Sequence, residues 1–135
     1  MSHDDTANAT ATTPAAADAA AGLWDTVDAL WASLEARQPI GGREGLLLAV
    51  LKLSEEVGET AQAVIGATGQ NPRKGTTHSW DDVQAELCDV VFTALIALRT
   101  LTPDARKVFA RHLDRVARRT LGPTAPPQPA PPEAS

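Results

Sequence analysis

The sequence predicts an all-α fold with four helices, and three observations support this. Apolar residues recur at three- and four-residue spacing in four segments, whereas no segment shows the alternation of a half-buried strand. Glycine, proline and small polar residues stand between these segments, where helices typically begin and end. The connections between the segments are short, which is typical of a helical bundle.

The first helix is expected from about Leu23 to Arg37. The segment 39–42 then ends it with one proline and two glycines. Trp24 and Trp31 lie seven residues apart, and we expect both in the core or a subunit interface rather than as platforms for a nucleobase. The apolar face at helical spacing consists of Leu23, Val27, Leu30, Trp31 and Leu34.

The second helix is expected from about Glu44 to Ile65, with Gly66 and Gly69 as candidates for its C-terminal cap. Its first half, residues 46–51, is apolar on every side and therefore needs cover on more than one face. The other three helices of the same chain do not easily provide that cover. We therefore expect a homodimer or larger homo-oligomer joined through helices.

The third helix is expected to begin after Ser79, which forms a candidate capping box with Asp82. A broad apolar face follows over residues 83–101. Thr102 and Pro103 are expected as the N-cap and first residue of the fourth helix. Basic side chains on that helix are expected to form a solvated face: Arg106, Lys107, Arg111, Arg115, Arg118 and Arg119.

The chain of 135 residues has a net charge of −5, but this charge is concentrated at its ends. Residues 22–121 hold all 12 basic residues and 13 of the 17 acidic ones, so their net charge is only −1. Residues 1–21 contain nine alanines, and residues 122–135 contain six of the ten prolines. Such ends lack bulky side chains to bury. We therefore expect two disordered tails around one helical domain at 22–121.

Several protein classes are set aside by the composition. The longest uncharged apolar run, residues 90–98, is far shorter than the ~18 residues of a membrane span. The N-terminus shows no basic region followed by an apolar stretch, so no secretory signal is expected. Cys88 is the single cysteine, which excludes an internal disulfide and fits a reducing cytoplasm. No basic face is rich enough to favour a nucleic-acid polymer as partner.

Acidic residues stand among apolar and small neighbours in the second and third helices. Glu56 with Glu59, and Glu86 with Asp89, form pairs that each share one helix face. Converging carboxylates repel one another and lose hydration, and a bound divalent cation offsets both costs. Oxygen ligands alone favour Mg²⁺ or Mn²⁺. Acids at this spacing, Glu55 included, also occur on solvated helix faces, so the pattern alone leaves both interpretations open.

Two motifs carry a resemblance to a known family. Residues 55–59 match the EExxE motif, and residues 86–89 the ExxD motif, of the MazG-like all-α NTP pyrophosphohydrolases. The similarity extends from about residue 46 to residue 98. It implies a four-helix MazG-like bundle that assembles as a homodimer or homotetramer.

The resemblance also implies an activity: the Mg²⁺-dependent cleavage of a nucleoside triphosphate, NTP or dNTP, to the monophosphate and pyrophosphate. By motif position it implies Glu56, Glu59, Glu86 and Asp89 as metal ligands. Glu55 would hold a further ion or orient the attacking water, so Glu55 and Glu56 are the expected catalytic residues. The residues themselves predict only a divalent metal in a helical bundle.

Cations near the acids are candidates for phosphate binding. Lys52 lies one turn before Glu56, although an ion pair with Glu55 or Glu56 is an equally good interpretation. Arg73 and Lys74 lie in the loop between the acidic pairs, where exposed cations are also common. The simpler expectation for Asn71 is a role in forming the turn, and for His78 it is a solvated side chain. Cys88 is expected to be a buried, inert thiol.

Two alternatives stay open. A phosphoribosyl-ATP pyrophosphatase has similar acids and a different substrate. A non-catalytic helical interaction module would keep the acids as a structural metal site or as a charged surface. The base preference and the number of metal ions do not follow from the sequence.

Overall fold

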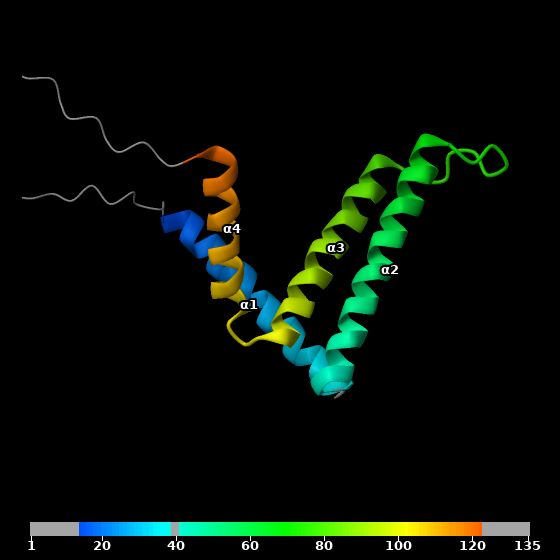
Figure 1. Ribbon diagram of the computed structural model, residues 1–135. Helices are drawn as coiled ribbons and strands as arrows, with labels where there is room; N and C mark the ends of the chain where they lie inside the picture. The colour runs from blue at the N-terminus through cyan, green and yellow to red at the C-terminus, as the bar shows by residue number, and fades with distance from the viewer. Residues whose placement is uncertain (1–13, 39–40, 123–135) are drawn as a thin grey trace, which may run out of the picture. The chain divides into compact units, whose positions relative to one another are not determined.

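The computed structural model describes residues 14–38 and 41–122, with side chains from residue 18 onward, and this part of the chain is all-α (Figure 1). It contains the helices α1 (Pro14–Arg37), α2 (Gly42–Thr68), α3 (Trp80–Leu101) and α4 (Ala105–Leu121), and no strand within these residues. The predicted all-α, four-helix class is therefore confirmed. The expected disorder of residues 1–13 and 123–135 lies outside the described residues.

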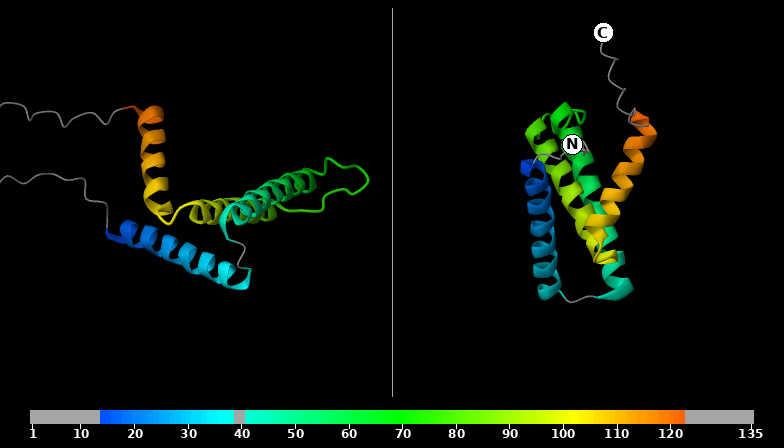
Figure 2. Two further views of the ribbon diagram at one scale, coloured as in Figure 1. Left: turned by 60° about the horizontal axis from the view of Figure 1, so that its bottom comes forward. Right: turned by 90° about the vertical axis from the view of Figure 1, so that its left-hand side faces the viewer.

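The chain divides into two compact units, one up to Pro103 and one from Asp104 onward. In the first unit, α2 and α3 run antiparallel side by side and share the largest contact (Figures 1 and 2). A smaller contact joins α1 to α3. The second unit contains α4, on which Arg118 pairs with Asp114 one turn away.

Helix α1 begins nine residues earlier than expected. It starts at Pro14 rather than near Leu23, so residues 14–21 belong to the helix and not to a tail. Proline suits the first helical position because its missing N–H would have no partner there, and the alanines that follow favour helix. The alanine-rich composition was therefore a sign of helix in this part of the chain. Trp24 and Val27 are buried, at 8% and 2% exposure.

The end of α2 confirms one predicted cap and corrects the other. Gly69 is the C-cap in the left-handed conformation (φ 65°), and its N–H donates to the Ile65 carbonyl oxygen. Gly66 lies inside the helix and is buried. A Cβ there would lie 2.1 Å from His78 Nδ1 and 2.5 Å from Thr77 Oγ1. Glycine at this position lets the loop after α2 return closely along the helix.

The start of α3 confirms the predicted capping box. Ser79 Oγ accepts from the Asp82 N–H at 3.2 Å, and Asp82 Oδ2 accepts from the Ser79 N–H at 2.8 Å. These two bonds satisfy amide groups that the first helical turn leaves without a partner.

The start of α4 differs from the prediction by two residues. Asp104, not Thr102, is its N-cap. The N–H of Thr102 still closes the last turn of α3 by donating to the Leu98 carbonyl oxygen at 3.0 Å. Thr102 also precedes Pro103, and a residue before proline favours the extended backbone seen here (φ −148°, ψ 136°). Thr102 therefore ends α3 instead of opening α4.

Candidate metal centre

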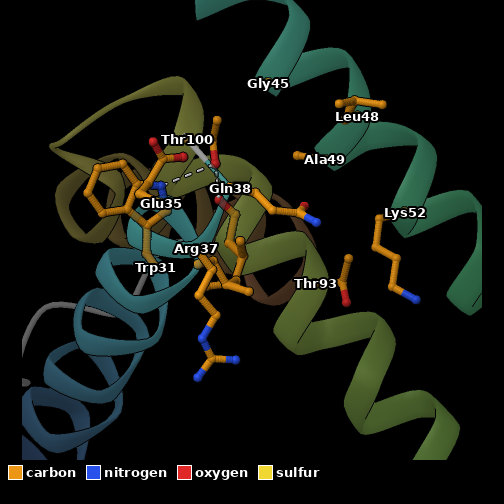
Figure 3. A pocket seen from close by; sticks show the side chains of 12 residues that line it. Trp31, Glu35, Arg37, Gln38, Gly45, Leu48, Ala49, Lys52, Thr93 and Thr100 are labelled. Carbon is orange, nitrogen blue, oxygen red and sulfur yellow. Dashed lines mark hydrogen bonds between the residues drawn. The ribbon is translucent and has the colours of Figure 1, made fainter. Parts of the chain in front are cut away.

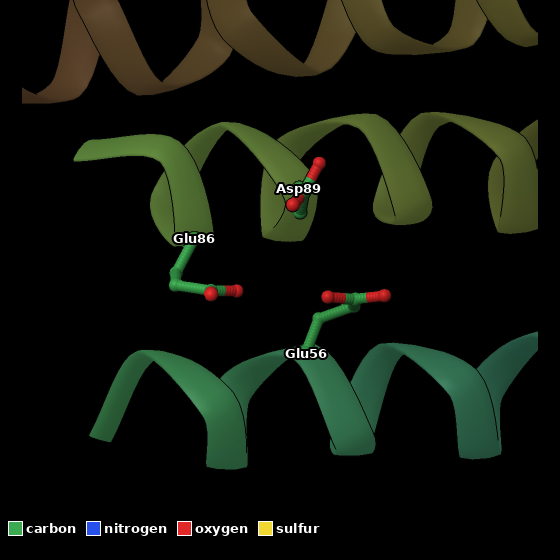
Figure 4. A group of neighbouring side chains, drawn as sticks. All are labelled: Glu56, Glu86 and Asp89. Atoms are coloured by element: carbon green, nitrogen blue, oxygen red, sulfur yellow. The ribbon is translucent and has the colours of Figure 1, made fainter. Parts of the chain in front are cut away.

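Three carboxylates converge between α2 and α3 (Figure 4). Glu56 comes from α2, whereas Glu86 and Asp89 come from α3, and one oxygen of each lies within 4.8 Å of the other two. Glu56 is only 7% exposed, Glu86 is half-buried and Asp89 is exposed. The cluster therefore has one buried and one open side.

The helical repeat explains why Glu56 is buried. The three buried residues of α2 are Glu56, Ala63 and Gly66. Their spacing of seven and three residues places them on one stripe of the helix. Small residues at the other two positions let α2 approach its neighbour closely, so the Glu56 carboxylate is held in a narrow space and loses much of its hydration. Glu86 and Asp89, three residues apart, share one face of α3.

Lys52 supplies the positive charge beside the cluster. Its Nζ lies 2.9 Å from Glu56 Oε1 and 3.0 Å from Glu55 Oε2. The hydrogen bond to Glu56, followed by that to Glu55, raises the pKa of Lys52, which therefore stays charged. The intrahelical ion pair considered for Lys52 is thus present, with both acids. Glu55 itself is on the open side, its side chain 57% exposed.

Glu59 lies near the cluster but outside the group of three. The negative charge of Glu56 is the main cause of a raised pKa at Glu59, followed by lost hydration and the charges of Glu86 and Glu55. Glu59 therefore lies in the same negative field, although the close-contact group of the described residues contains only the other three acids. Its expected role as a ligand stays a prediction.

The loop cations form no ion pair with the acids among the described residues. Arg73 and Lys74 follow the end of α2, whose last residue is twelve positions beyond Glu56, or about 18 Å along the axis. Asn71 shapes this loop, since its Oδ1 accepts from the Arg73 N–H at 3.2 Å. Lys74 lines a small cavity of about 330 Å³ there, with His78 in its wall. The expected contact of Arg73 and Lys74 with a phosphate stays a prediction.

A larger cavity of about 410 Å³ lies between the C-terminal half of α1, the first half of α2 and the second half of α3 (Figure 3). Lys52 lines it, so the cavity borders the acid cluster. Trp31 forms part of the opposite wall, and its Nε1 donates to Thr100 Oγ1 at 3.3 Å. No pattern in the sequence predicted this cavity, because its walls come from three helices far apart in the chain.

Arg99 on α3 holds Trp31 in that wall. Its Cζ lies 4.1 Å from the centre of the Trp31 ring, and its Nε donates to Asp28 Oδ1 at 2.7 Å. Both partners are on α1. Arg99 directly follows the apolar segment 94–98, and this position of an arginine was a sign in the sequence that α3 makes a polar contact there.

The donor set of the acid cluster fits a hard divalent cation. All of its donors are carboxylate oxygens, which Mg²⁺ and Mn²⁺ prefer, and one of the acids is buried at a cost that a cation offsets. Among the described helices, none is long and apolar enough to cross a membrane. Comparison with known proteins adds no relative: no family model, no curated protein and no solved structure matches this chain.

Proposed function

We propose that this protein is a Mg²⁺-dependent nucleoside triphosphate pyrophosphohydrolase, with Mn²⁺ as an alternative ion. The observation that carries the proposal is the convergence of Glu56, Glu86 and Asp89 from two helices, with the first of them buried. The EExxE and ExxD motifs and their resemblance to the MazG-like family support the choice of substrate. The same resemblance, the apolar first half of α2 and the single cysteine support a cytoplasmic homo-oligomer.

The residues have distinct tasks in the proposed reaction. Glu56, Glu86 and Asp89 would hold the ion, with Glu59 beside them. A bound divalent cation supplies charge neutralisation at the phosphate oxygens. Glu55 lies on the open side of α2, where its carboxylate can orient a water molecule and accept its proton. The water oxygen bonds to the α-phosphorus, the bond from that phosphorus to the bridging oxygen breaks, and pyrophosphate leaves.

The activity is tested with a panel of standard and modified nucleoside triphosphates in the presence of Mg²⁺. We expect pyrophosphate and the nucleoside monophosphate in equal amounts. The panel includes phosphoribosyl-ATP, so a preference for that substrate would identify the related pyrophosphatase instead. No pyrophosphate from any member of the panel would contradict the enzyme and favour a non-catalytic interaction module.

The ligand assignment is tested with Glu56→Gln and Asp89→Asn. Each variant loses one anionic ligand with little change in shape, so we expect turnover to fall at least a hundredfold and the Mg²⁺-induced rise in melting temperature to disappear. Without Mg²⁺, Asp89→Asn should melt higher than the wild type, because it relieves repulsion in the cluster and keeps the ion pair between Lys52 and Glu56. Glu44→Gln, on the first turn of α2, is the matched control. Unchanged turnover and Mg²⁺ response in both cluster variants would show that the ligands lie elsewhere.

A further inference from the structure

Lys52 belongs to two features of the molecule at once. Its ammonium group pairs with the buried Glu56, and its side chain lines the 410 Å³ cavity (Figure 3). It lies one turn before Glu56 on α2, while Thr93, another cavity residue, lies one turn after Asp89 on the antiparallel α3. The acid cluster and the cavity are therefore neighbours along α2 and α3, and Lys52 lies between them.

The position of Lys52 conflicts with a second cation at Glu56. The Glu56 carboxylate is buried, and its Oε1 pairs with the Lys52 ammonium group, so a divalent ion bound to this carboxylate would lie close to that ammonium group and repel it. The Lys52 side chain can move away from Glu56, because it is 53% exposed and flexible. Its other partner, Glu55, is also exposed, and such surface pairs hold a lysine only weakly.

We propose that Lys52 is an exchangeable counter-ion: it neutralises Glu56 in the metal-free protein, and it turns into the neighbouring cavity when a divalent cation takes that carboxylate. There its ammonium group binds the phosphate of an anionic ligand. Among the described residues of the cavity wall, Arg37 is the second cation and Glu35 the one acid. The cavity volume lies within the range of small-molecule sites.

This inference rests on the proposed function for its metal and its phosphate ligand, and it adds a coupling between them. A metal that frees Lys52 makes the cavity more positive, so it strengthens anion binding. By thermodynamic reciprocity, the anion must strengthen metal binding by the same factor.

The movement of Lys52 can be observed directly, because the chain contains only three lysines: Lys52, Lys74 and Lys107. The full-length protein is labelled with ¹³C-lysine, and the side-chain signals are assigned with Lys52→Arg. We expect Mg²⁺ to shift the Lys52 signal and to leave the other two unchanged. Addition of nucleoside monophosphates, the four standard ones as a mixture, should then shift it further, and much less so before Mg²⁺ is added.

Metal affinity supplies a second readout. In Lys52→Met, the competing ammonium group is gone, so Mn²⁺ should bind about fivefold more tightly in calorimetry, and the monophosphates should no longer strengthen its binding. Arg43→Gln removes one positive charge elsewhere on the same helix and should behave like the wild type. A lysine that only stabilised α2 would affect the melting temperature without removing the coupling.

The results separate this inference from the proposed function. If Mg²⁺ raises the melting temperature while the Lys52 signal stays in place, or if Lys52→Met retains the coupling, the exchange is refuted even where pyrophosphate is released. If Lys52 moves and the monophosphates bind, but no triphosphate is cleaved, the exchange stands and the hydrolase does not. If Mg²⁺ changes none of these readouts, both the exchange of Lys52 and the proposed hydrolase are refuted.

Discussion

Glu59 has a raised pKa because negative charges lie close together between α2 and α3. Its pKa lies above the ordinary value of 4.5, chiefly because Glu56 is nearby. The folded protein thus takes up this proton more readily than the unfolded chain does. Stability from this group is gained as the pH falls through the folded pKa, is complete below 4.5, and is lost again as the pH rises.

Glu59→Gln should remove this pH dependence. At neutral pH and without Mg²⁺, we expect the variant to melt at a higher temperature than the wild type, since one repelling charge is gone. The difference should shrink as the pH is lowered towards 4.5, because the wild-type group becomes neutral as well. Thermal unfolding of both proteins across this pH range measures it, with Glu44→Gln as control. A difference that is constant with pH would place Glu59 outside the field of the cluster.

At the scale of residues, three of the four acids that helical spacing paired converge in the structure, and Glu59 lies outside this group. Glu86 and Asp89 share a face because they are three residues apart, and Glu56 faces them because its stripe is otherwise small and buried. Spacing could not predict how deep each acid lies, since that depends on the neighbouring helix. It also could not predict that Lys52 pairs with both Glu55 and Glu56, because spacings of three and of four residues both allow an ion pair on a helix.

At the scale of elements, α1 joins the first unit through α3, and Arg99 is central to that contact. It bonds Asp28 and lies over the Trp31 ring, so one side chain holds two positions of α1. No local pattern predicted this, because Arg99 and Asp28 are 71 residues apart and neither belongs to a motif. The capping box at Ser79 was predictable for the opposite reason, since its partners are three residues apart.

Arg99→Met should loosen α1 from the rest of its unit. Methionine retains apolar bulk but loses the ion pair and the cation–π contact, which together contribute about 1–2 kcal/mol. Hydrogen exchange followed by mass spectrometry should show faster exchange in α1 and little change in the second half of α2. Arg73→Met, in the loop after α2, controls for the loss of an arginine. Equal exchange of α1 in variant and wild type would show that other contacts hold this helix.

At the scale of the whole molecule, bulky apolar side chains on α2 remain uncovered within the described chain. Leu51 is 64% exposed, Leu47 55% and Val50 52%. The apolar first half of this helix predicted a need for cover, and the structure shows which side chains lack it. One sequence contains no pattern that specifies which surface covers these side chains. We expect a second copy to do so, as the predicted homo-oligomer requires.

Leu51→Glu should therefore weaken the assembly. The side chain is largely exposed in the single chain, so the substitution should cost the monomer less than about 0.5 kcal/mol, whereas a charge buried in an interface costs several times more. Light scattering coupled to size exclusion should show a shift to the monomer. Ala61→Glu adds the same charge at another exposed position of α2. An unchanged mass for Leu51→Glu would place the interface on another surface.

The fully buried Ala63 has a consequence for the kind of ion that the proposed metal site would accept. It lies two turns beyond Glu56 on the same stripe and has no exposed surface, so its single methyl group helps to set the gap between α2 and α3. Oxygen atoms close around Mg²⁺ at about 2.1 Å and around Ca²⁺ at about 2.4 Å. A larger side chain at this position would part the helices and favour the larger ion. The discrimination between ionic radii would then depend on a residue that never touches the metal.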